Sequence, residues 1–219
     1  MKDFKVIEVK RSIFEDNNAD ADRLREQLKS EGTFLLNLMS SPGAGKTTTL
    51  KRTINMLKDE IDIGVMEADI DSDVDAQAIT DTGVRAIQIH TGGMCHLDAD
   101  MTRQGINEFG TKDLDLVFLE NVGNLVCPAE FDTGSTKNAM ILSVPEGDDK
   151  PLKYPLMFTI SDVVLITLSV FDDFSKKDVE ERIHNLNPNA KVFFVSAKTG
   201  EGFEQWTDWL KNELKIYSK

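Results

Sequence analysis

The sequence predicts an α/β fold: a doubly wound, mostly parallel sheet of about seven strands, with helices on both faces. Two observations favour this class. Runs of consecutive apolar residues, such as Val163-Val164-Leu165-Ile166, are typical of parallel strands that helices cover on both faces. Amphipathic helical patterns separate most of these runs, and strands that alternate with helices in this way build a doubly wound sheet.

The expected elements alternate along most of the chain. We expect strands at 33–39, 61–67, 84–90, 114–119, 138–144, 162–168 and 191–195. Helical patterns lie near 46–59, 73–81, 97–109, 176–186 and 202–214. Ligands of such sheets bind beyond the carboxyl ends of the strands, so the residues that follow each strand are the first candidates for function.

The composition indicates a soluble globular protein with an acidic surface. The chain has 219 residues, of which 40% are hydrophobic and 29% charged, which suffices for one domain with a sizeable core. The formal net charge of −13 argues against a nucleic-acid-binding face. No apolar run reaches transmembrane length and no secretory signal is present, so we expect a cytoplasmic protein without a membrane partner.

Residues 38–50, with the sequence LMSSPGAGKTTTL, have the pattern of a phosphate-binding loop. An apolar run precedes the glycines and Lys46 opens a helical pattern, which gives the order strand, small-residue loop, helix start. Backbone N–H groups and the helix dipole then face a phosphate. Lys46 reaches the outer phosphates, and the hydroxyl of Thr47 binds Mg²⁺. The nucleotide-binding residues predicted here are Ser41, Gly43, Ala44, Gly45, Lys46, Thr47 and Thr48.

Acidic residues follow the second expected strand. The segment 67–75 holds five acids in nine residues, which would be costly in a core, so we interpret it as a strand-end loop. Asp69 is nearest to the strand, and we predict that it holds Mg²⁺ together with Thr47, directly or through water. For Asp71 and Asp73 a solvated acidic face is the preferred interpretation.

A second candidate segment follows the fourth expected strand. Glu120 ends that strand and faces the nucleotide side of the sheet. In G-proteins, a related acid-x-x-Gly segment senses the γ-phosphate through the N–H group of its glycine. Gly123 occupies the position of that glycine here. The predicted catalytic residues are therefore Lys46, Asp69, Glu120 and Gly123.

Both cysteines of the chain stand in loops next to the expected nucleotide site. Cys95 and His96 lie where a helix begins, and Cys127 follows Gly123 by four residues. In a reducing compartment a disulfide is disfavoured, so a metal site is the leading interpretation, with small structural residues as the alternative. A Cys/His catalytic dyad is less favoured, because side chains adjacent in sequence rarely point at each other.

Three segments together resemble HypB, the GTPase family that serves nickel incorporation into [NiFe]-hydrogenase. They are the phosphate loop, Thr91-Gly92-x-x-Cys95-His96-Leu97-Asp98-Ala99, and the run from Glu120 to Pro128 with Cys127. The segment 146–155, EGDDKPLKYP, is similar too. The related family UreG carries a Cys-Pro-His segment that is absent from this sequence.

The resemblance implies a P-loop nucleoside triphosphatase of the SIMIBI class, which works as a homodimer gated by nucleotide and metal. It assigns Cys95, His96 and Cys127 as ligands of Ni²⁺ or Zn²⁺ and implies GTP with Mg²⁺ as the nucleotide. It also implies two partners, the nickel-insertion protein HypA and the hydrogenase large-subunit precursor. A non-catalytic nucleotide and metal switch, and a urease-type nickel accessory protein, remain the alternatives.

The base-reading segment departs from the family. Where the family has Asn-Lys-x-Asp after the sixth strand, this chain has Thr167-Leu168-Ser169-Val170. Val170 therefore stands at the position of the Asp that accepts hydrogen bonds from guanine. Asp172 or Asp173 could substitute through a shifted loop, and ATP stays open beside GTP. The second base-contacting segment of the family matches Ser196, Ala197 and Lys198.

The first residues are expected to form an amino-terminal helical arm, 1–30, ahead of a nucleotide-binding (G) domain, 31–219. Val9 and Ile13 fit a short helix or an added strand, and Asn17-Asn18 is expected to break the pattern. A second helix is then predicted at 19–29. An arm that contacts a partner and a lid that packs on the domain are equally compatible with this pattern.

Overall fold

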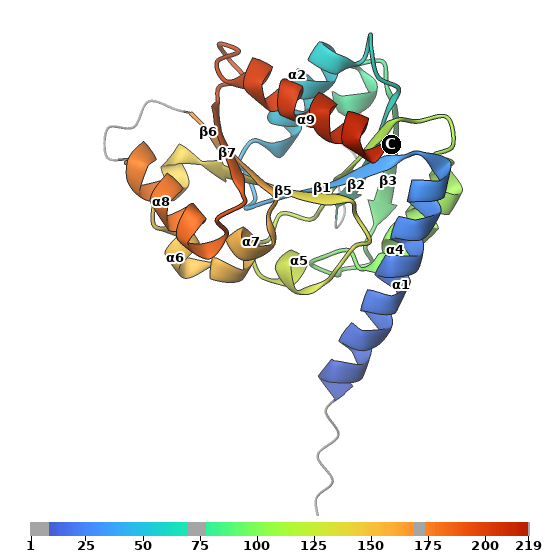
Figure 1. Ribbon diagram of the computed structural model, residues 1–219. Helices are drawn as coiled ribbons and strands as arrows, with labels where there is room; N and C mark the ends of the chain where they lie inside the picture. Colours follow the sequence, from blue (N-terminus) through green and yellow to red (C-terminus); the bar gives the residue numbers. More distant parts are fainter. Residues whose placement is uncertain (1–8, 70–77, 169–173, 219) are drawn as a thin grey trace, which may run out of the picture.

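The sheet has the predicted class and is parallel throughout its described strands. The computed structural model describes residues 9–69, 78–168 and 174–218, and they form one seven-stranded sheet with the order β3-β2-β4-β1-β5-β6-β7 (Figure 1). Every neighbouring pair is parallel. The strands are β1 (Phe34–Ser40), β2 (Ile63–Asp69), β3 (Arg85–His90), β4 (Leu116–Glu120), β5 (Lys137–Ser143), β6 (Val163–Thr167) and β7 (Lys191–Val195).

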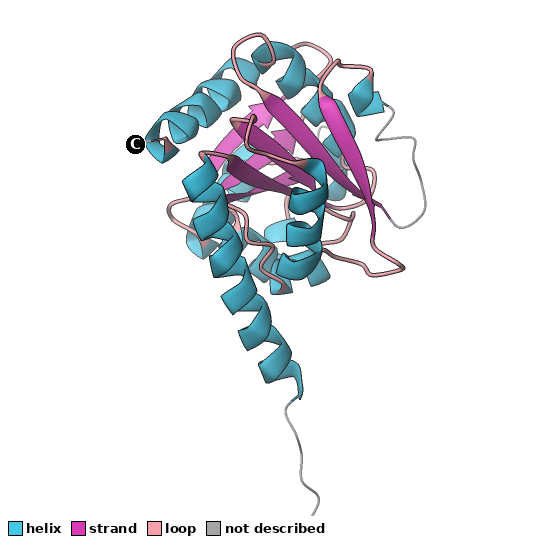
Figure 2. Ribbon diagram, turned by 90° about the vertical axis from the view of Figure 1, so that its right-hand side faces the viewer, coloured by secondary structure: helices cyan, strands magenta, loops and turns pink. Residues whose placement is uncertain are grey.

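Helices cover both faces of the sheet, as Figures 1 and 2 show. α2 (Lys46–Leu57) and α9 (Phe203–Tyr217) lie on one face, and most other helices lie on the opposite face. These others are α1 (Val9–Glu31), α4 (Ala99–Phe109), α5 (Cys127–Glu130), η1 (Val144–Glu146), α6 (Lys150–Lys153), α7 (Pro155–Ile160) and α8 (Lys176–Leu186). The short helices between Cys127 and Ile160 were not expected, because four to six residues show no helical period.

Three apolar clusters fill the space between the sheet and its helices. The α2 and α9 face holds Phe34, Leu36 and Leu38 of β1, and the central strands β1 and β4 are buried along their full length. One face of α9 belongs to the core, with Phe203, Trp206 and Leu210 buried. Apolar runs predicted these strands because a strand covered on both faces needs apolar side chains on both.

The amino-terminal segment differs from the prediction, because α1 is one helix from Val9 to Glu31 and Asn17-Asn18 does not break it. The buried face Asn17, Ala21, Leu24 and Leu28 follows the helical period without interruption. Asn17 is tolerated there because its side-chain amide hydrogen-bonds outside the helix, to Ala99 and Asp132. α1 thus packs on the domain over Leu24 and Leu28, as the lid interpretation requires, and the boundary at residue 30 stays a prediction.

Across the described ranges, no helix has both the length and the apolar sequence that a membrane span requires.

Candidate functional site

The phosphate-loop residues form a turn at the carboxyl end of β1. Gly43 and Gly45 have φ angles of 73° and 89°, a region that favours glycine, and α2 starts directly afterwards at Lys46. The Lys46 Nζ donates to Ser40 Oγ at 3.1 Å, and the buried Ser40 hydroxyl donates to the Ser41 carbonyl at 2.6 Å. Ser40 therefore holds the Lys46 side chain by a hydrogen bond.

Thr47 meets a carboxylate from a different strand. Its Oγ1 donates to Glu120 Oε1 at 3.1 Å, and Glu120 ends β4 with only 2% of its surface exposed. Hydroxyl and carboxylate oxygens are the ligands that Mg²⁺ takes beside a nucleotide. The structure thus places Glu120 next to the predicted magnesium residue on α2.

Glu67 is a candidate residue that the sequence analysis placed wrongly. It was expected to begin a strand-end loop, but β2 continues to Asp69, and Glu67 lies inside the strand and is buried. Glu67 pairs with Glu120 in register, and side chains at paired positions of parallel strands point to the same face. That face is the α2 side, because the neighbouring residues Val65 and Phe118 belong to its core cluster. Two buried carboxylates side by side favour a bound cation.

The structure describes only part of the acidic segment 67–75. The backbone of Asp69 ends β2 and pairs with His90, whereas the Asp69 side chain lies outside the described part of the structure. The segment 70–77, with Asp71 and Asp73, lies outside it too, as does most of the helix expected at 73–81.

Gly123 contacts the phosphate loop directly. A Cβ atom at this position would lie 3.1 Å from both Cα and N of Pro42, which is closer than nearly all Cβ contacts. A side chain at this position would require Pro42 to shift by a few tenths of an ångström. A change in the phosphate loop therefore reaches Gly123 without an intermediate side chain.

The base-side residues follow β6 and β7. Thr167 Oγ1 donates to the Ala44 carbonyl at 3.4 Å, which joins the end of β6 to the phosphate loop. Ser196, Ala197 and Lys198 follow β7 in a turn in which Thr199 N donates to Ser196 Oγ at 3.3 Å. Residues 169–173, which include Ser169, Val170, Asp172 and Asp173, lie outside the described residues.

The two cysteines and His96 come together although they lie in separate loops. The Sγ atoms of Cys95 and Cys127 are 2.8 Å apart, and Cys95 Sγ is 3.9 Å from His96 Nδ1. The donor atoms of all three residues lie within 4.8 Å of one another, and both thiols are free. One metal ion can contact all three, and two thiolates with an imidazole suit both Ni²⁺ and Zn²⁺.

The pKa values of two residues of this cluster, His96 and Cys127, are shifted by their surroundings. Burial dominates at His96. It lowers the pKa of His96 more than the carboxylates of Asp98 and Glu130 raise it, which favours the neutral imidazole that binds metals. The His96 ring stacks on Phe131 with centroids 3.9 Å apart, and its Nε2 has no hydrogen-bond partner among the described residues. The hydrogen bond with Cys95, and then burial, raise the pKa of the Cys127 thiol, so metal binding releases a proton there.

Asn121 joins the loop of Cys95 and His96 to the segment that begins at Glu120. The sequence analysis did not identify this residue. Its fully buried Oδ1 accepts from Leu97 N at 3.2 Å and from Val122 N at 2.9 Å. Its Nδ2 donates to Asn37 Oδ1 on β1 at 3.1 Å. A polar residue in an otherwise buried segment was the available signal, but its partners could not be known from the sequence.

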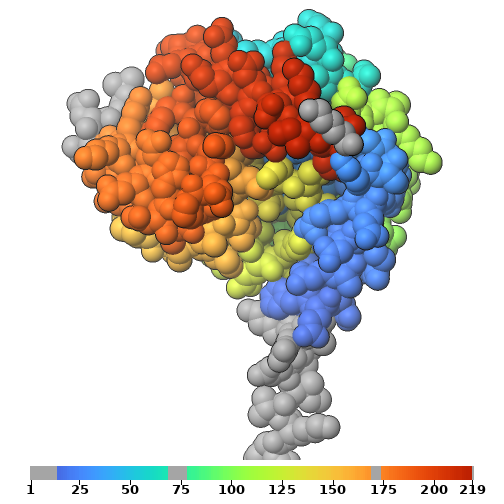
Figure 3. Space-filling model, in the orientation of Figure 1, coloured from blue at the N-terminus to red at the C-terminus, as the bar shows by residue number. Residues whose placement is uncertain are grey.

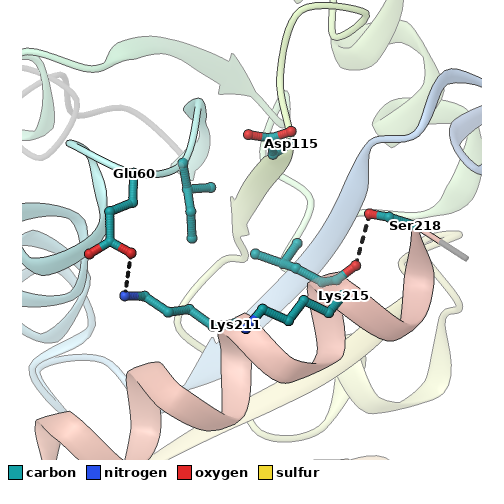
Figure 4. A pocket seen from close by; sticks show the side chains of 7 residues that line it. Glu60, Asp115, Lys211, Lys215 and Ser218 are labelled. Carbon is teal, nitrogen blue, oxygen red and sulfur yellow. Dashed lines mark hydrogen bonds and ion pairs between the residues drawn. The ribbon is translucent and has the colours of Figure 1, made fainter.

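A further hollow lies at the opposite end of the sheet (Figure 4). Asp115 precedes β4 and Ile61 precedes β2, so the hollow opens at the amino ends of the strands. Lys211 on α9 forms an ion pair with Glu60 there at 2.6 Å. Because ligands of doubly wound sheets bind at the carboxyl ends, we do not assign the site to this hollow.

A family profile described as "CobW/HypB/UreG, nucleotide-binding domain" matches residues 34–194. With the seven-stranded parallel sheet and the phosphate loop, this match defines the class of the chain: a nucleotide-binding protein of the P-loop type.

Individual relatives narrow the family. The hydrogenase maturation factor HypB of Rhizobium leguminosarum bv. viciae is 43% identical over 214 residues, 96% of this chain and 72% of that protein. The hydrogenase/urease maturation factor HypB of Helicobacter hepaticus is 39% identical over 95% of this chain and 88% of its own. The crystal structure of HypB from Helicobacter pylori in complex with nickel has a TM-score of 0.85 and 38% identity, covering 93% of this chain and 97% of that one. The chain belongs to the HypB family of hydrogenase maturation factors, which confirms the resemblance seen in its motifs.

Proposed function

We propose that this protein is a GTP-hydrolysing metallochaperone that delivers nickel during the maturation of [NiFe]-hydrogenase. The observation that carries the proposal is the cluster of Cys95, His96 and Cys127, whose donor atoms lie within 4.8 Å of one another. This cluster stands beside the segment that contacts the phosphate loop through Gly123. A metal site and a nucleotide site so close together suit a protein whose cargo binding follows its nucleotide state.

The nucleotide site supports hydrolysis by positioning and charge neutralisation. The N–H groups of the loop and of the start of α2 would hold the phosphates, and Lys46 would turn from Ser40 to the outer phosphate oxygens. Thr47 and Glu120, together with Glu67 or Asp69, would hold Mg²⁺. When bound, Mg²⁺ supplies positive charge next to the phosphoryl group that leaves.

The metal site is proposed to be shared between two copies of the chain. One copy offers three donors, whereas a closed four-coordinate site needs one more. Met94 and Val126, the neighbours of Cys95 and Cys127, are large apolar residues that are 46% and 51% exposed. Exposed apolar residues beside an incomplete metal site favour a homodimer whose interface lies there. The donors suit both Ni²⁺ and Zn²⁺. We propose nickel as the cargo because the chain belongs to the HypB family.

The family and the cysteines support a proposal for the partners and the location. We infer HypA and the hydrogenase large-subunit precursor as partners. The alternative is an accessory role in supplying nickel to urease, because the relative from Helicobacter hepaticus is a hydrogenase/urease maturation factor. Two free thiols suit a reducing compartment, so the proposal includes a cytoplasmic location.

Two matched variants test the two sites separately. Ni²⁺ titration and single-turnover GTP hydrolysis are measured in the unmodified protein, in Lys46→Ala and in Cys127→Ala. We expect Lys46→Ala to lose hydrolysis and keep Ni²⁺ binding, because its charge acts only on the phosphates. We expect Cys127→Ala to lose the metal and keep nucleotide binding.

Each outcome against expectation removes a defined part of the proposal. Near-normal turnover in folded Lys46→Ala would refute the phosphate assignment. No hydrolysis by the unmodified protein, with or without Ni²⁺, would identify a non-catalytic switch instead. Unchanged Ni²⁺ affinity in Cys127→Ala would return both cysteines to a structural role.

A further inference from the structure

The two loops that carry the thiol–imidazole cluster are connected by a residue of the amino-terminal helix. Asn17 Oδ1 accepts from Ala99 N at 2.9 Å, and Asn17 Nδ2 donates to the Asp132 carbonyl at 2.9 Å. Ala99 follows His96 by three residues, and Asp132 follows Cys127 by five. One amide side chain therefore holds the loop of Cys95 and His96 and the loop of Cys127 at a fixed separation.

The hydrogen bond from Ala99 to Asn17 gives a partner to a backbone N–H group that has none within α4. Ala99 is the first residue of α4, where a backbone N–H has no partner within the helix. The helix cap, Asp98, accepts from Met101 N and leaves the N–H of Ala99 free for Asn17. Asn17 is 8% exposed, so water does not readily replace either of its side-chain bonds.

Other contacts of α1 hold the loop of Cys127. Phe14, one helical turn before Asn17, contacts Phe131, whose ring stacks on His96. Arg25 pairs with the Asp132 carboxylate, and its Nε donates to the Ser135 carbonyl at 3.0 Å. In Figure 3, α1 in blue lies against the yellow-green surface that includes the chain after α5. The helix is thus fixed against one loop at several points, and Asn17 carries that constraint to the other.

From these contacts we infer that Asn17 is a positioning residue for the metal cluster: it sets the distance between the loop of Cys95 and His96 and the loop of Cys127. The inference rests on the proposed metal site and adds a role for α1 in its formation. Without the two bonds this link between the loops is lost, and metal binding has to supply more of their ordering. By linkage, a bound metal tightens the contact of α1 with Ala99 and Asp132.

The test compares two neighbouring asparagines of the same helix. Asn17→Ala removes both bonds, whereas Asn18→Ala makes the same substitution at an exposed position and changes helix propensity equally. Ni²⁺ affinity is measured by competition with a chromogenic chelator, and Co²⁺ spectra report the geometry of the thiolate site. For Asn17→Ala we expect about tenfold weaker Ni²⁺ binding, which corresponds to the loss of about one net hydrogen bond. The absorption bands of bound Co²⁺ should also be weaker in this variant. Asn18→Ala should match the unmodified protein in both.

Two further measurements separate the possible outcomes. Asn17→Asp keeps an acceptor for Ala99 N but sets a carboxylate against the Asp132 carbonyl, so it should bind Ni²⁺ as weakly as Asn17→Ala. In the unmodified protein, Ni²⁺ should slow hydrogen exchange at the Ala99 amide, a measurement that does not depend on how well a variant folds. Unchanged affinity and spectrum in folded Asn17→Ala, or no change in exchange at Ala99, would overturn the inference while leaving the metal site intact. No Ni²⁺ binding by the unmodified protein would overturn the metal site as well.

Discussion

At the scale of single residues, Val170 marks a departure in base recognition. The Asp of the family's Asn-Lys-x-Asp segment accepts two N–H groups of guanine, and a valine side chain accepts none. Thr167, at the start of the matching segment, bonds to Ala44 of the phosphate loop, so the segment leaves β6 beside the nucleotide site. The substitution therefore stands in the segment that follows, in sequence, the strand end bonded to the phosphate loop.

We predict that the protein discriminates GTP from ATP less than relatives that have the intact segment. Each lost charge-assisted hydrogen bond is worth about 1.5–3 kcal/mol. Val170→Asp combined with Leu168→Lys should restore part of the preference, measured as the ratio of the dissociation constants of GTP and ATP. A preference for GTP of about 10⁴-fold or more in the unmodified protein would mean that another carboxylate, such as Asp172 or Asp173, fills the role.

The residues predicted from short motifs and those missed differ in where their partners lie. Lys46 is recognisable because its motif itself carries the chemistry, whereas the pair Cys95-His96 became a metal candidate only together with Cys127. Glu67 and Asn121 acquire their roles only through pairing with other strands and loops, which no local pattern encodes. The closeness of Cys127 to Cys95 was predictable in outline, since both follow strands that end at the same edge of the sheet.

At the scale of elements, strands were predicted best and the amino-terminal helix least well. Every expected strand is present because buried parallel strands need apolar runs. The break expected at Asn17-Asn18 is wrong, because tertiary hydrogen bonds compensate for the low helix propensity of asparagine. A rule of local sequence thus failed at the residue for which we infer a role in the metal site.

The contact between α2 and α9 yields a prediction for stability. The buried Trp206 Nε1 donates to Thr53 Oγ1 at 2.9 Å, and Thr53 in turn donates to the Thr49 carbonyl. Thr53→Val keeps the shape but leaves the indole N–H without an acceptor, which should lower the free energy of unfolding by about 1–3 kcal/mol. Urea unfolding measures this change. In a Trp206→Phe background the donor is gone, so Thr53→Val should cost much less there. An equal cost in both backgrounds would show that the hydrogen bond contributes nothing specific.

At the scale of the whole molecule, the proposed nucleotide and metal sites lie toward opposite faces of the sheet and are linked at the end of β4. Glu120 points to the α2 face, where Thr47 lies, and Asn121 bonds to Asn37 and Leu97 toward the α1 and α4 face. Successive residues of an extended chain point to opposite faces, so a shift of this segment is felt on both sides. Asn121 N also donates to the Leu38 carbonyl at 3.0 Å, which fixes the segment to the strand that leads into the phosphate loop.

This arrangement predicts that nucleotide state and metal affinity depend on each other through Asn121. A non-hydrolysable GTP analogue should tighten Ni²⁺ binding and favour the dimer relative to GDP, by a factor within the usual range of about 5–150. The effect is reciprocal, so Ni²⁺ should tighten binding of the analogue by the same factor. Titrations with each nucleotide give the ratio of Ni²⁺ affinities, and light scattering gives the fraction of dimer.

Asn121→Ala should bring that ratio close to one while each ligand still binds. The substitution leaves the N–H groups of Leu97 and Val122 without their acceptor, so the loop of Cys95 and His96 no longer follows the segment of Glu120. Asn107→Ala, at an exposed position on α4, is the matched control and should keep the coupling of the unmodified protein. Unfolding curves establish that both variants are folded at the temperature of the titration. If folded Asn121→Ala retains the full ratio, the coupling runs instead through the chain from Gly123 to Cys127, and the side chain of Asn121 serves only to stabilise the fold.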